Sequence, residues 1–158
     1  MTVYISKSHK DTQAFALRFA LELPEGAVVA LEGDLGAGKT AFVQGLAQGL
    51  GVYHPEDVTS PTYALMHVYE AQWGQLYHFD FYRIASVSHF ESLGFTTMLG
   101  VLPNRYVIEW ASRFAQVLPK NAMWTVTLTT RSARTRTIVC VPPSYSPPLP
   151  LLPSPPQT

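Results

Sequence analysis

The sequence is poor in charge, has almost no cysteine and contains no long apolar run. Only 14% of its 158 residues are charged, and eleven Lys and Arg balance eleven Asp and Glu. A neutral chain argues against a protein that holds nucleic acid through many phosphate contacts. The single cysteine, Cys140, excludes an internal disulfide and a cysteine-based zinc site, which favours a reducing compartment. Without a membrane-length apolar run or a signal-peptide pattern, we expect a cytoplasmic protein with no membrane partner.

Proline is distributed unevenly along the chain. Residues 142–158 contain 8 of the 13 prolines. Proline lacks a backbone donor and fixes φ, so this stretch is expected to be a disordered or polyproline-II tail. Its PxxP spacings match ligands of SH3-type domains, but a solvated tail without a partner is the preferred interpretation. We therefore expect a folded domain over residues 1–141, with 47% apolar residues overall to build its core.

Helix and strand signals alternate through the first 141 residues. Helices are expected over 12–22, with Asp11 or Thr12 as N-cap, over 40–50, and from Ser86 or Ser88 to Leu93. Strands are expected over 27–31, 63–69, 76–82 and 106–108, and a closing hairpin over 122–129 and 136–141. This order predicts an α/β sandwich with a mixed sheet.

The sharpest motif is a glycine-rich loop between the strand at 27–31 and the helix at 40–50. It satisfies G-x-x-x-x-G-K-[ST] in full, and both flanking elements are of the right type. Glycines let the backbone N–H groups turn toward a phosphate, and the following helix N-terminus adds partial positive charge. A lysine and a hydroxyl then serve the β- and γ-phosphates and Mg²⁺. The predicted nucleotide-binding residues here are Gly33, Asp34, Leu35, Gly36, Ala37, Gly38, Lys39, Thr40 and Ala41.

Two apolar strands end in an acidic residue. Asp80 ends the strand that starts at Leu76, and it is the best candidate for a second Mg²⁺ ligand, of the Walker B type. The alternative is an ordinary ion pair with Arg83. Glu109 ends the strand at 106–108, where it would polarise the attacking water or touch the metal, unless it is a solvated residue at a strand end. Trp110, which follows it, is either a site residue or part of the core.

Three further signals leave alternatives open. The segment Thr59–Thr62 is either a switch that contacts phosphate or Mg²⁺, or a plain turn favoured by Ser60-Pro61. His78 alternates with Asp80 on one strand face, so it either approaches the site or packs in the core. The arginines near the closing hairpin are more typical of a solvated tip than of a phosphate or RNA contact; they are Arg131, Arg134 and Arg136.

Together these segments resemble the TsaE family of small P-loop ATPases. The resemblance is carried by 31–40, 59–63, 77–83 and 108–110, in this order and spacing. It implies a P-loop NTPase-like three-layer sandwich that binds ATP and Mg²⁺ and acts with the TsaD and TsaB proteins. These install threonylcarbamoyl on the adenosine next to the anticodon, giving t6A in tRNAs that read codons beginning with A. The proline-rich tail is not part of the family pattern, and the region of Arg134 and Arg136 matches it only loosely.

By matching position, the resemblance assigns roles to individual residues. Thr40, Asp80 and Glu109 would serve Mg²⁺; Lys39, Asp80 and Glu109 would be catalytic; Ser60, Thr62 and Trp110 would join the loop in binding the nucleotide. The protein would reach tRNA only through its partners. The alternatives are a small-molecule or nucleoside kinase of the P-loop class, which about 140 folded residues leave little room for, and a nucleotide-binding adaptor that does not hydrolyse.

Overall fold

A mixed sheet forms the centre of the computed structural model, which describes residues 1–144. The seven strands lie in the order β1-β7-β6-β2-β5-β4-β3. Strands β6, β2, β5 and β4 run parallel, and β1, β7 and β3 pair antiparallel at the two sides. Their bounds are Thr2–Ser6 (β1), Val28–Glu32 (β2), Met66–Ala71 (β3), Gly74–Asp80 (β4), Arg105–Glu109 (β5), Trp124–Thr130 (β6) and Arg136–Val141 (β7).

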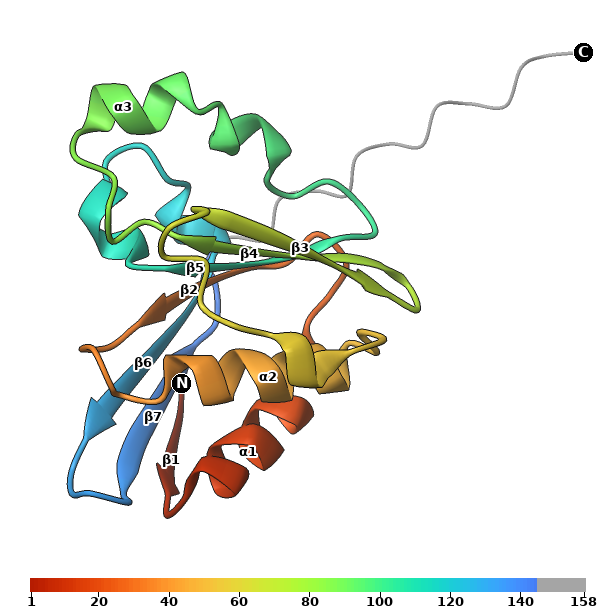
Figure 1. The fold of residues 1–158 in the computed structure, drawn as a ribbon, viewed down its shortest axis with the longest axis vertical. Coiled ribbons are helices and arrows are strands. Elements are labelled where there is room, and N and C mark those ends of the chain that lie inside the picture. Colours follow the sequence, from red (N-terminus) through yellow and green to blue (C-terminus); the bar gives the residue numbers. More distant parts are fainter. Residues whose placement is uncertain (145–158) are drawn as a thin grey trace, which may run out of the picture.

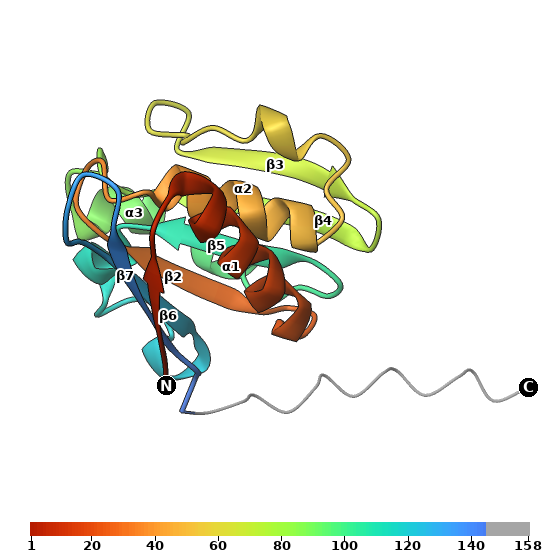
Figure 2. The ribbon, with the colours of Figure 1, turned by 90° about the horizontal axis from the view of Figure 1, so that it is seen from below.

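Helices cover both faces of this sheet (Figures 1 and 2). Helices α1 (His9–Glu22) and α2 (Lys39–Gly49) pack on one face, and α3 (Val87–Ser92) lies over the other. Short 3-10 helices span Pro55–Asp57, Phe95–Met98, Ala111–Phe114 and Lys120–Ala122. The predicted α/β sandwich with a mixed central sheet is confirmed. Residues 145–158, most of the predicted proline-rich tail, lie outside the described residues.

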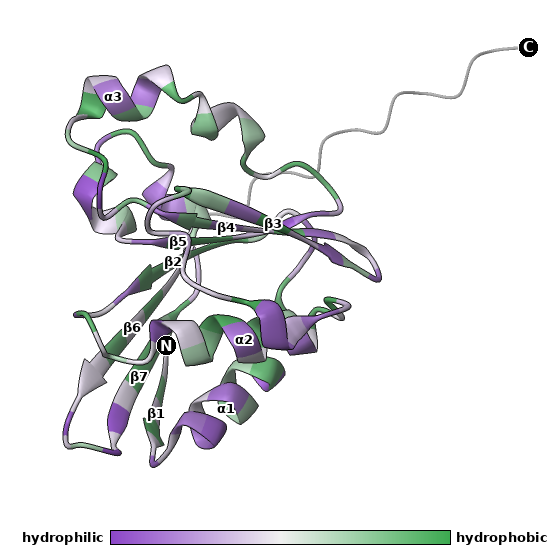
Figure 3. Ribbon diagram, in the orientation of Figure 1, coloured by the Kyte–Doolittle hydropathy of each residue, from purple (hydrophilic) through white to green (hydrophobic). Residues whose placement is uncertain are grey.

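The central strands are buried on both faces, which explains their uninterrupted apolar sequence. In β2, Val29 and Leu31 face the core under α1 and α2, whereas Val28 and Ala30 face the core under α3. The same split applies to β5, where Val107 and Ile108 point to opposite cores. The covering helices are amphipathic, and both hydropathy colours appear along α1 and α2 in Figure 3. Parallel strands covered on both sides read as continuous apolar runs for this reason.

Helix α1 begins three residues earlier than predicted, and neither Asp11 nor Thr12 is its cap. The hydroxyl of Ser8 accepts from the backbone N–H of Asp11 at 3.1 Å and is the N-cap. The Asp11 carboxylate instead accepts from the Tyr4 hydroxyl at 2.5 Å. That contact lowers the pKa of Asp11, because the hydroxyl of Tyr4 stabilises the charged carboxylate. Asp11 therefore ties the helix to β1, an edge strand that the sequence analysis did not predict.

The other predicted helices and strands differ from the structure only at their ends. The strand expected over 63–69 begins at Met66, and the strand expected over 76–82 is β4, which starts at Gly74 and ends at Asp80. Between Pro61 and β3 the chain turns, and the Leu65 N–H donates to the Pro61 carbonyl at 2.7 Å. Ser86, the first of the two proposed caps, caps α3. The closing hairpin forms as predicted between β6 and β7.

Two glycines of α2 allow it to pack closely on α1; at Gly49, a Cβ atom would lie 2.5 Å from the backbone oxygen of Leu17. A Cβ atom on Gly45, in the middle of α2, would lie 2.2 Å from the backbone oxygen of Gln13 in α1. No side chain larger than hydrogen fits there, so the two helix backbones touch. The side-chain amide of Gln13 also donates to that of Gln44 at 2.9 Å. This close contact fixes the position of α2 and therefore of the loop that precedes it.

Candidate functional site

A cavity of about 490 Å³ opens at the carboxyl ends of the parallel strands. Asp80 and Glu109 pair in the register of β4 and β5, and Leu31 pairs with Glu109 on the other side, so both acids lie next to the loop that leaves β2. The predicted site residues that line the cavity are Leu35, Gly36, Gly38, Lys39, Thr40, Ala41, Ser60, Thr62, Asp80, Glu109 and Trp110. His9, Gln44 and Tyr82 line it as well, and none of these was predicted.

The glycine-rich loop wraps the start of α2. Gly38 caps the helix with a φ of 102°, a left-handed conformation that strains any residue with a side chain. Ala37 is buried under the loop, and its N–H donates to the carbonyl of Asp34 at 3.0 Å. Three residues of the predicted nucleotide-binding loop do not line the cavity: Gly33, Asp34 and Ala37. They maintain the shape of the loop instead. The first N–H groups of α2 have no partner within the helix, and they belong to residues at the cavity wall.

Lys39 is folded back onto the loop. Its ammonium group donates to the carbonyl of Gly33 at 2.5 Å and to that of Asp34 at 3.2 Å, and it lies 4.4 Å from the ring centre of Trp110. Burial lowers the pKa of Lys39, and the carboxylates of Glu109 and Asp80 oppose that shift. The Lys39 ammonium is partly buried, and its close contacts are neutral carbonyls and an aromatic ring. A negatively charged ligand would therefore stabilise it more than a neutral one.

Asp80 binds the segment at 60–62 and makes no ion pair with Arg83. One carboxylate oxygen accepts from the hydroxyls of Ser60 and Thr62, each at 2.9 Å, and the other accepts from the Tyr82 N–H at 2.9 Å. The guanidinium of Arg83 instead stacks on Tyr63, 4.4 Å from its ring centre. The ion-pair interpretation of Asp80 is therefore wrong. The segment at 60–62 is more than a plain turn, since two of its hydroxyls are tied to an acid in the cavity wall.

Glu109 is buried and bonded to His78. The two side chains lie on neighbouring strands, and Nε2 of His78 is 2.7 Å from Oε1 of Glu109. The expectation that His78 lies either near the site or in the core was too narrow, because His78 is fully buried and also touches a cavity residue. The alternative of a solvated glutamate is wrong, since Glu109 is 2% exposed.

Trp110 follows the end of β5, and its ring contacts Lys39 at the end of the glycine-rich loop. Its φ of 61° turns the chain sharply after β5, into the 3-10 helix at Ala111–Phe114. Its ring packs on Tyr82, with 5.2 Å between ring centres, and its other neighbour is the Lys39 ammonium. Both neighbours line the cavity, so Trp110 does more than fill the core.

Arg136 supports the glycine-rich loop, so its interpretation as part of a solvated hairpin tip is wrong. It is 8% exposed, and its guanidinium donates to the loop carbonyl of Ala37 at 3.1 Å as well as to carbonyls of its own hairpin. Arg131 and Arg134 are exposed near the hairpin tip, as expected. The available signal was alternation in β7, because Arg136 shares the strand face of Ile138 and Cys140, which point into the core under α2.

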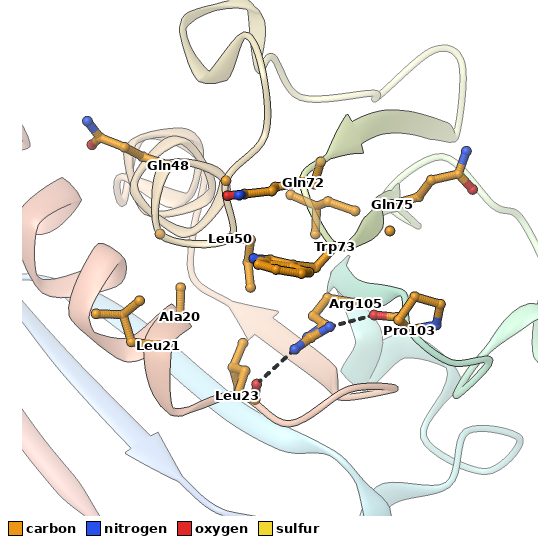
Figure 4. A pocket seen from close by; sticks show the side chains of 15 residues that line it. Ala20, Leu21, Leu23, Gln48, Leu50, Gln72, Trp73, Gln75, Pro103 and Arg105 are labelled. Atoms are coloured by element: carbon orange, nitrogen blue, oxygen red, sulfur yellow. Dashed lines mark hydrogen bonds between the residues drawn. The ribbon is translucent and has the colours of Figure 1, made fainter.

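A second cavity, of about 390 Å³, lies at the opposite, amino ends of β4 and β5 (Figure 4). Trp73 lies over Arg105, whose guanidinium donates to the carbonyls of Leu23 at 3.4 Å and Pro103 at 2.5 Å. None of the predicted site residues lines this cavity. Within residues 1–144, no three or more His, Cys, Asp or Glu side chains form a metal cluster. In the same part of the chain, no helix has the length and apolar character to cross a membrane.

The chain is similar to proteins that have been named and, in one case, solved. The family model described as "Threonylcarbamoyl adenosine biosynthesis protein TsaE" matches residues 6–138. The protein of that name from Treponema pallidum is 43% identical over 130 residues, covering 80% of this chain and 89% of the relative. The one from Borreliella burgdorferi is 37% identical over 121 residues, covering 77% and 86%. The crystal structure of Bacillus subtilis YdiB matches with a TM-score of 0.64 and 26% identity, covering 87% of this chain and 82% of that one. The chain therefore belongs to the TsaE family, as its motifs predicted.

Proposed function

We propose that this protein binds ATP with Mg²⁺ and hydrolyses it as an accessory protein in the formation of t6A in tRNA. The observation that carries the proposal is the gathering of Lys39, Thr40, Asp80 and Glu109 around one cavity. They come from three separate segments, and each is of the type that phosphoryl chemistry requires. The names of the relatives, which are t6A biosynthesis proteins, give the pathway.

Phosphate binding is supported by the loop and Lys39. The loop supplies backbone N–H groups at the N-terminus of α2, which favours negative charge. On nucleotide binding, the Lys39 ammonium would exchange the carbonyls of Gly33 and Asp34 for β- and γ-phosphate oxygens. Arg136 adds a buried positive charge directly behind the loop, where it has carbonyls and no carboxylate as partners among the described residues.

The residues at the cavity also fit Mg²⁺. The hydroxyl of Thr40 and the carboxylate of Asp80 both belong to its wall, and hard oxygen ligands of this kind suit the ion. Mg²⁺ in nucleotide sites typically keeps few protein ligands and completes its shell with phosphate oxygens and water, which agrees with the lack of an all-protein cluster in residues 1–144. When bound, the ion neutralises charge that develops on the phosphates.

Hydrolysis requires a water molecule aligned with the γ-phosphorus. The water oxygen bonds to that phosphorus while the bond to the β,γ-bridging oxygen breaks, giving ADP, inorganic phosphate and one proton. We assign to Glu109 the role of orienting the water and accepting its hydrogen, and this assignment is supported by the position of Glu109 in the cavity wall one strand away from Asp80. Lys39 would hold the leaving phosphates.

The site is a candidate switch that protein partners read. The TsaD and TsaB proteins are the proposed partners, and TsaD would carry out the threonylcarbamoyl transfer. Ser60 and Thr62 are tied to Asp80, so the loss of a γ-phosphate and its metal near Asp80 would be passed to the surface at 59–63, where Tyr63 is 85% exposed. The formal net charge of zero argues that the protein contacts tRNA only through these partners. We propose the cytoplasm as the compartment in which they act.

A titration of ATP with Mg²⁺ tests the proposal. We expect Lys39→Met to weaken ATP binding at least tenfold while the protein stays folded, and Lys120→Met, which removes an exposed lysine at the far end of the sheet, to leave it unchanged. Phosphate release is then measured with and without TsaD and TsaB. Equal affinity in the two variants would refute the binding site, and a phosphorylated acceptor in place of free phosphate would indicate a kinase.

A further inference from the structure

The buried contact between His78 and Glu109 is a specific arrangement of two polar groups. The side chain of His78 is 0% exposed and that of Glu109 is 3% exposed. His78 lies in β4 and Glu109 in β5, so the contact forms only after the two strands have paired. Asp80 lies two residues after His78 on the same strand face, opposite Glu109 in the register. Glu109 lines the cavity, and His78 lies behind it, in the buried interior.

Hydrogen-bonding capacity fixes the direction of this contact. An ionised carboxylate only accepts hydrogen bonds, so Nε2 of His78 is the donor to Oε1 of Glu109, at 2.7 Å. The other ring nitrogen, Nδ1, is buried and has no partner in residues 1–144. A ring with its one hydrogen on Nε2 therefore leaves no buried N–H without an acceptor. His78 presents a single donor, and it points at Glu109.

The consequence for Glu109 is a defined orientation. Oε1 is held by the imidazole, whereas Oε2 accepts no hydrogen bond from residues 1–144 and is not among their buried unpaired atoms. Since Glu109 lines the cavity, Oε2 is its accessible oxygen. A carboxylate without the His78 contact could rotate and spread both oxygens over several positions, which would cost alignment at the reacting centre.

We propose that His78 is a positioning residue, which holds Oε1 of Glu109 so that Oε2 faces the nucleotide cavity and meets the attacking water. The inference rests on the proposed ATPase function. His78 itself touches neither nucleotide nor water, and its effect passes through Glu109. A purely structural role, the satisfaction of a buried carboxylate, would instead change stability and leave the chemical step alone.

Two amide variants separate these roles. The side-chain nitrogen of glutamine can take the place of Nε2, whereas that of asparagine reaches only the region of Nδ1. We expect His78→Gln to keep turnover within about threefold of wild type, and His78→Asn and His78→Leu to lose about ten- to a hundredfold, the range seen when groups that orient metal ligands are removed. The affinity for ATP should stay within twofold in all of them. His67→Leu is the matched control, because His67 is the partner of His78 in the neighbouring strand β3.

The measurements are steady-state phosphate release by the full chain with TsaD and TsaB, ATP affinity by titration calorimetry, and thermal unfolding. In a Glu109→Gln background, the further change His78→Leu should cost no additional turnover, because the group it positions is already gone. Equal turnover in the glutamine and asparagine variants, or wild-type turnover in the leucine variant, would overturn the positioning role. If wild type and Glu109→Gln hydrolyse ATP equally, Glu109 does not orient the water, and the positioning role of His78 fails with it. If neither hydrolyses ATP, the proposed function itself fails, which is a separate result.

Discussion

Replacing Asp80 by alanine and by asparagine separates its two proposed roles. The carboxylate accepts hydrogen bonds from Ser60, Thr62 and the Tyr82 N–H, so it holds the segment at 60–62 before any ligand binds. It is also the proposed ligand of Mg²⁺. Alanine removes both the hydrogen bonds and the charge. Asparagine removes the charge but keeps the shape. Its amide oxygen can still accept from the Tyr82 N–H, and its amide nitrogen can donate to the hydroxyl oxygens of Ser60 and Thr62.

The stability change follows from these contacts. A hydrogen bond to a charged group contributes about 1.5–3 kcal/mol, but hydroxyls near the surface regain part of that from water. For Asp80→Ala we therefore expect a loss of about 3 kcal/mol in the free energy of unfolding. For a chain of this size that corresponds to a Tm lower by roughly 6–12 °C. Asp80→Asn should cost only about 1 kcal/mol, since one weaker neutral set of hydrogen bonds replaces the charged set.

The assay is thermal unfolding without nucleotide, followed by ATP titration with and without Mg²⁺. Wild type should bind ATP more tightly with Mg²⁺, and both variants should lose that difference. Asp57→Ala, an exposed acid in the 3-10 helix at Pro55–Asp57, is the control and should change neither quantity. An asparagine variant with the full Mg²⁺ dependence would refute the metal role. An alanine variant with the wild-type Tm would show that the contacts to 60–62 do not hold the segment.

Three further predictions concern the parts that support the site. Arg136→Met should lower the free energy of unfolding by about 2–3 kcal/mol and weaken ATP binding, because a buried loop carbonyl loses its donor, whereas exposed Arg134→Met should do neither in denaturant and ligand titrations. Gly45→Ala should destabilise by about 1–3 kcal/mol in urea despite its better helix propensity, because it forces α1 away, while Gln48→Ala on the exposed side of α2 should be nearly neutral. Burial raises the pKa of the Cys140 thiol to about 11, so a thiol reagent should react at pH 8 only after guanidinium is added. The free energy of unfolding should fall as pH rises from about 9 toward 11, because only the unfolded thiol ionises in that range. Rapid labelling of the folded chain would contradict this.

Local sequence was enough to predict the glycine-rich loop between β2 and α2 and most of the helices and strands. The spacing of glycines, Lys39 and Thr40 after an apolar strand is a local signal, because one continuous stretch of backbone builds the whole loop. Central strands were equally readable, since burial on both faces leaves an uninterrupted apolar run. The predicted ends of the helices were less accurate where a side chain bonds to a different element. The carboxylate of Asp11 bonds to Tyr4 in β1, and the N-cap of α1 is Ser8 instead.

What only the tertiary structure decided is which polar groups meet. From the sequence, Asp80 was predicted to be a Mg²⁺ ligand, with an ion pair to Arg83 as the alternative, and Arg136 was assigned to a hairpin cluster. His78 was left between the site and the core. The contacts that these side chains make depend on strand register and loop position. Asp80 bonds across the site to Ser60 and Thr62, which are 20 and 18 residues away in the chain. Glu109 and His78 meet across 31 residues, and Arg136 reaches the loop across 99. Contacts of this range arise because burial leaves each polar group only the partners that the packed strands bring to it, and no local pattern in the sequence encodes that pairing.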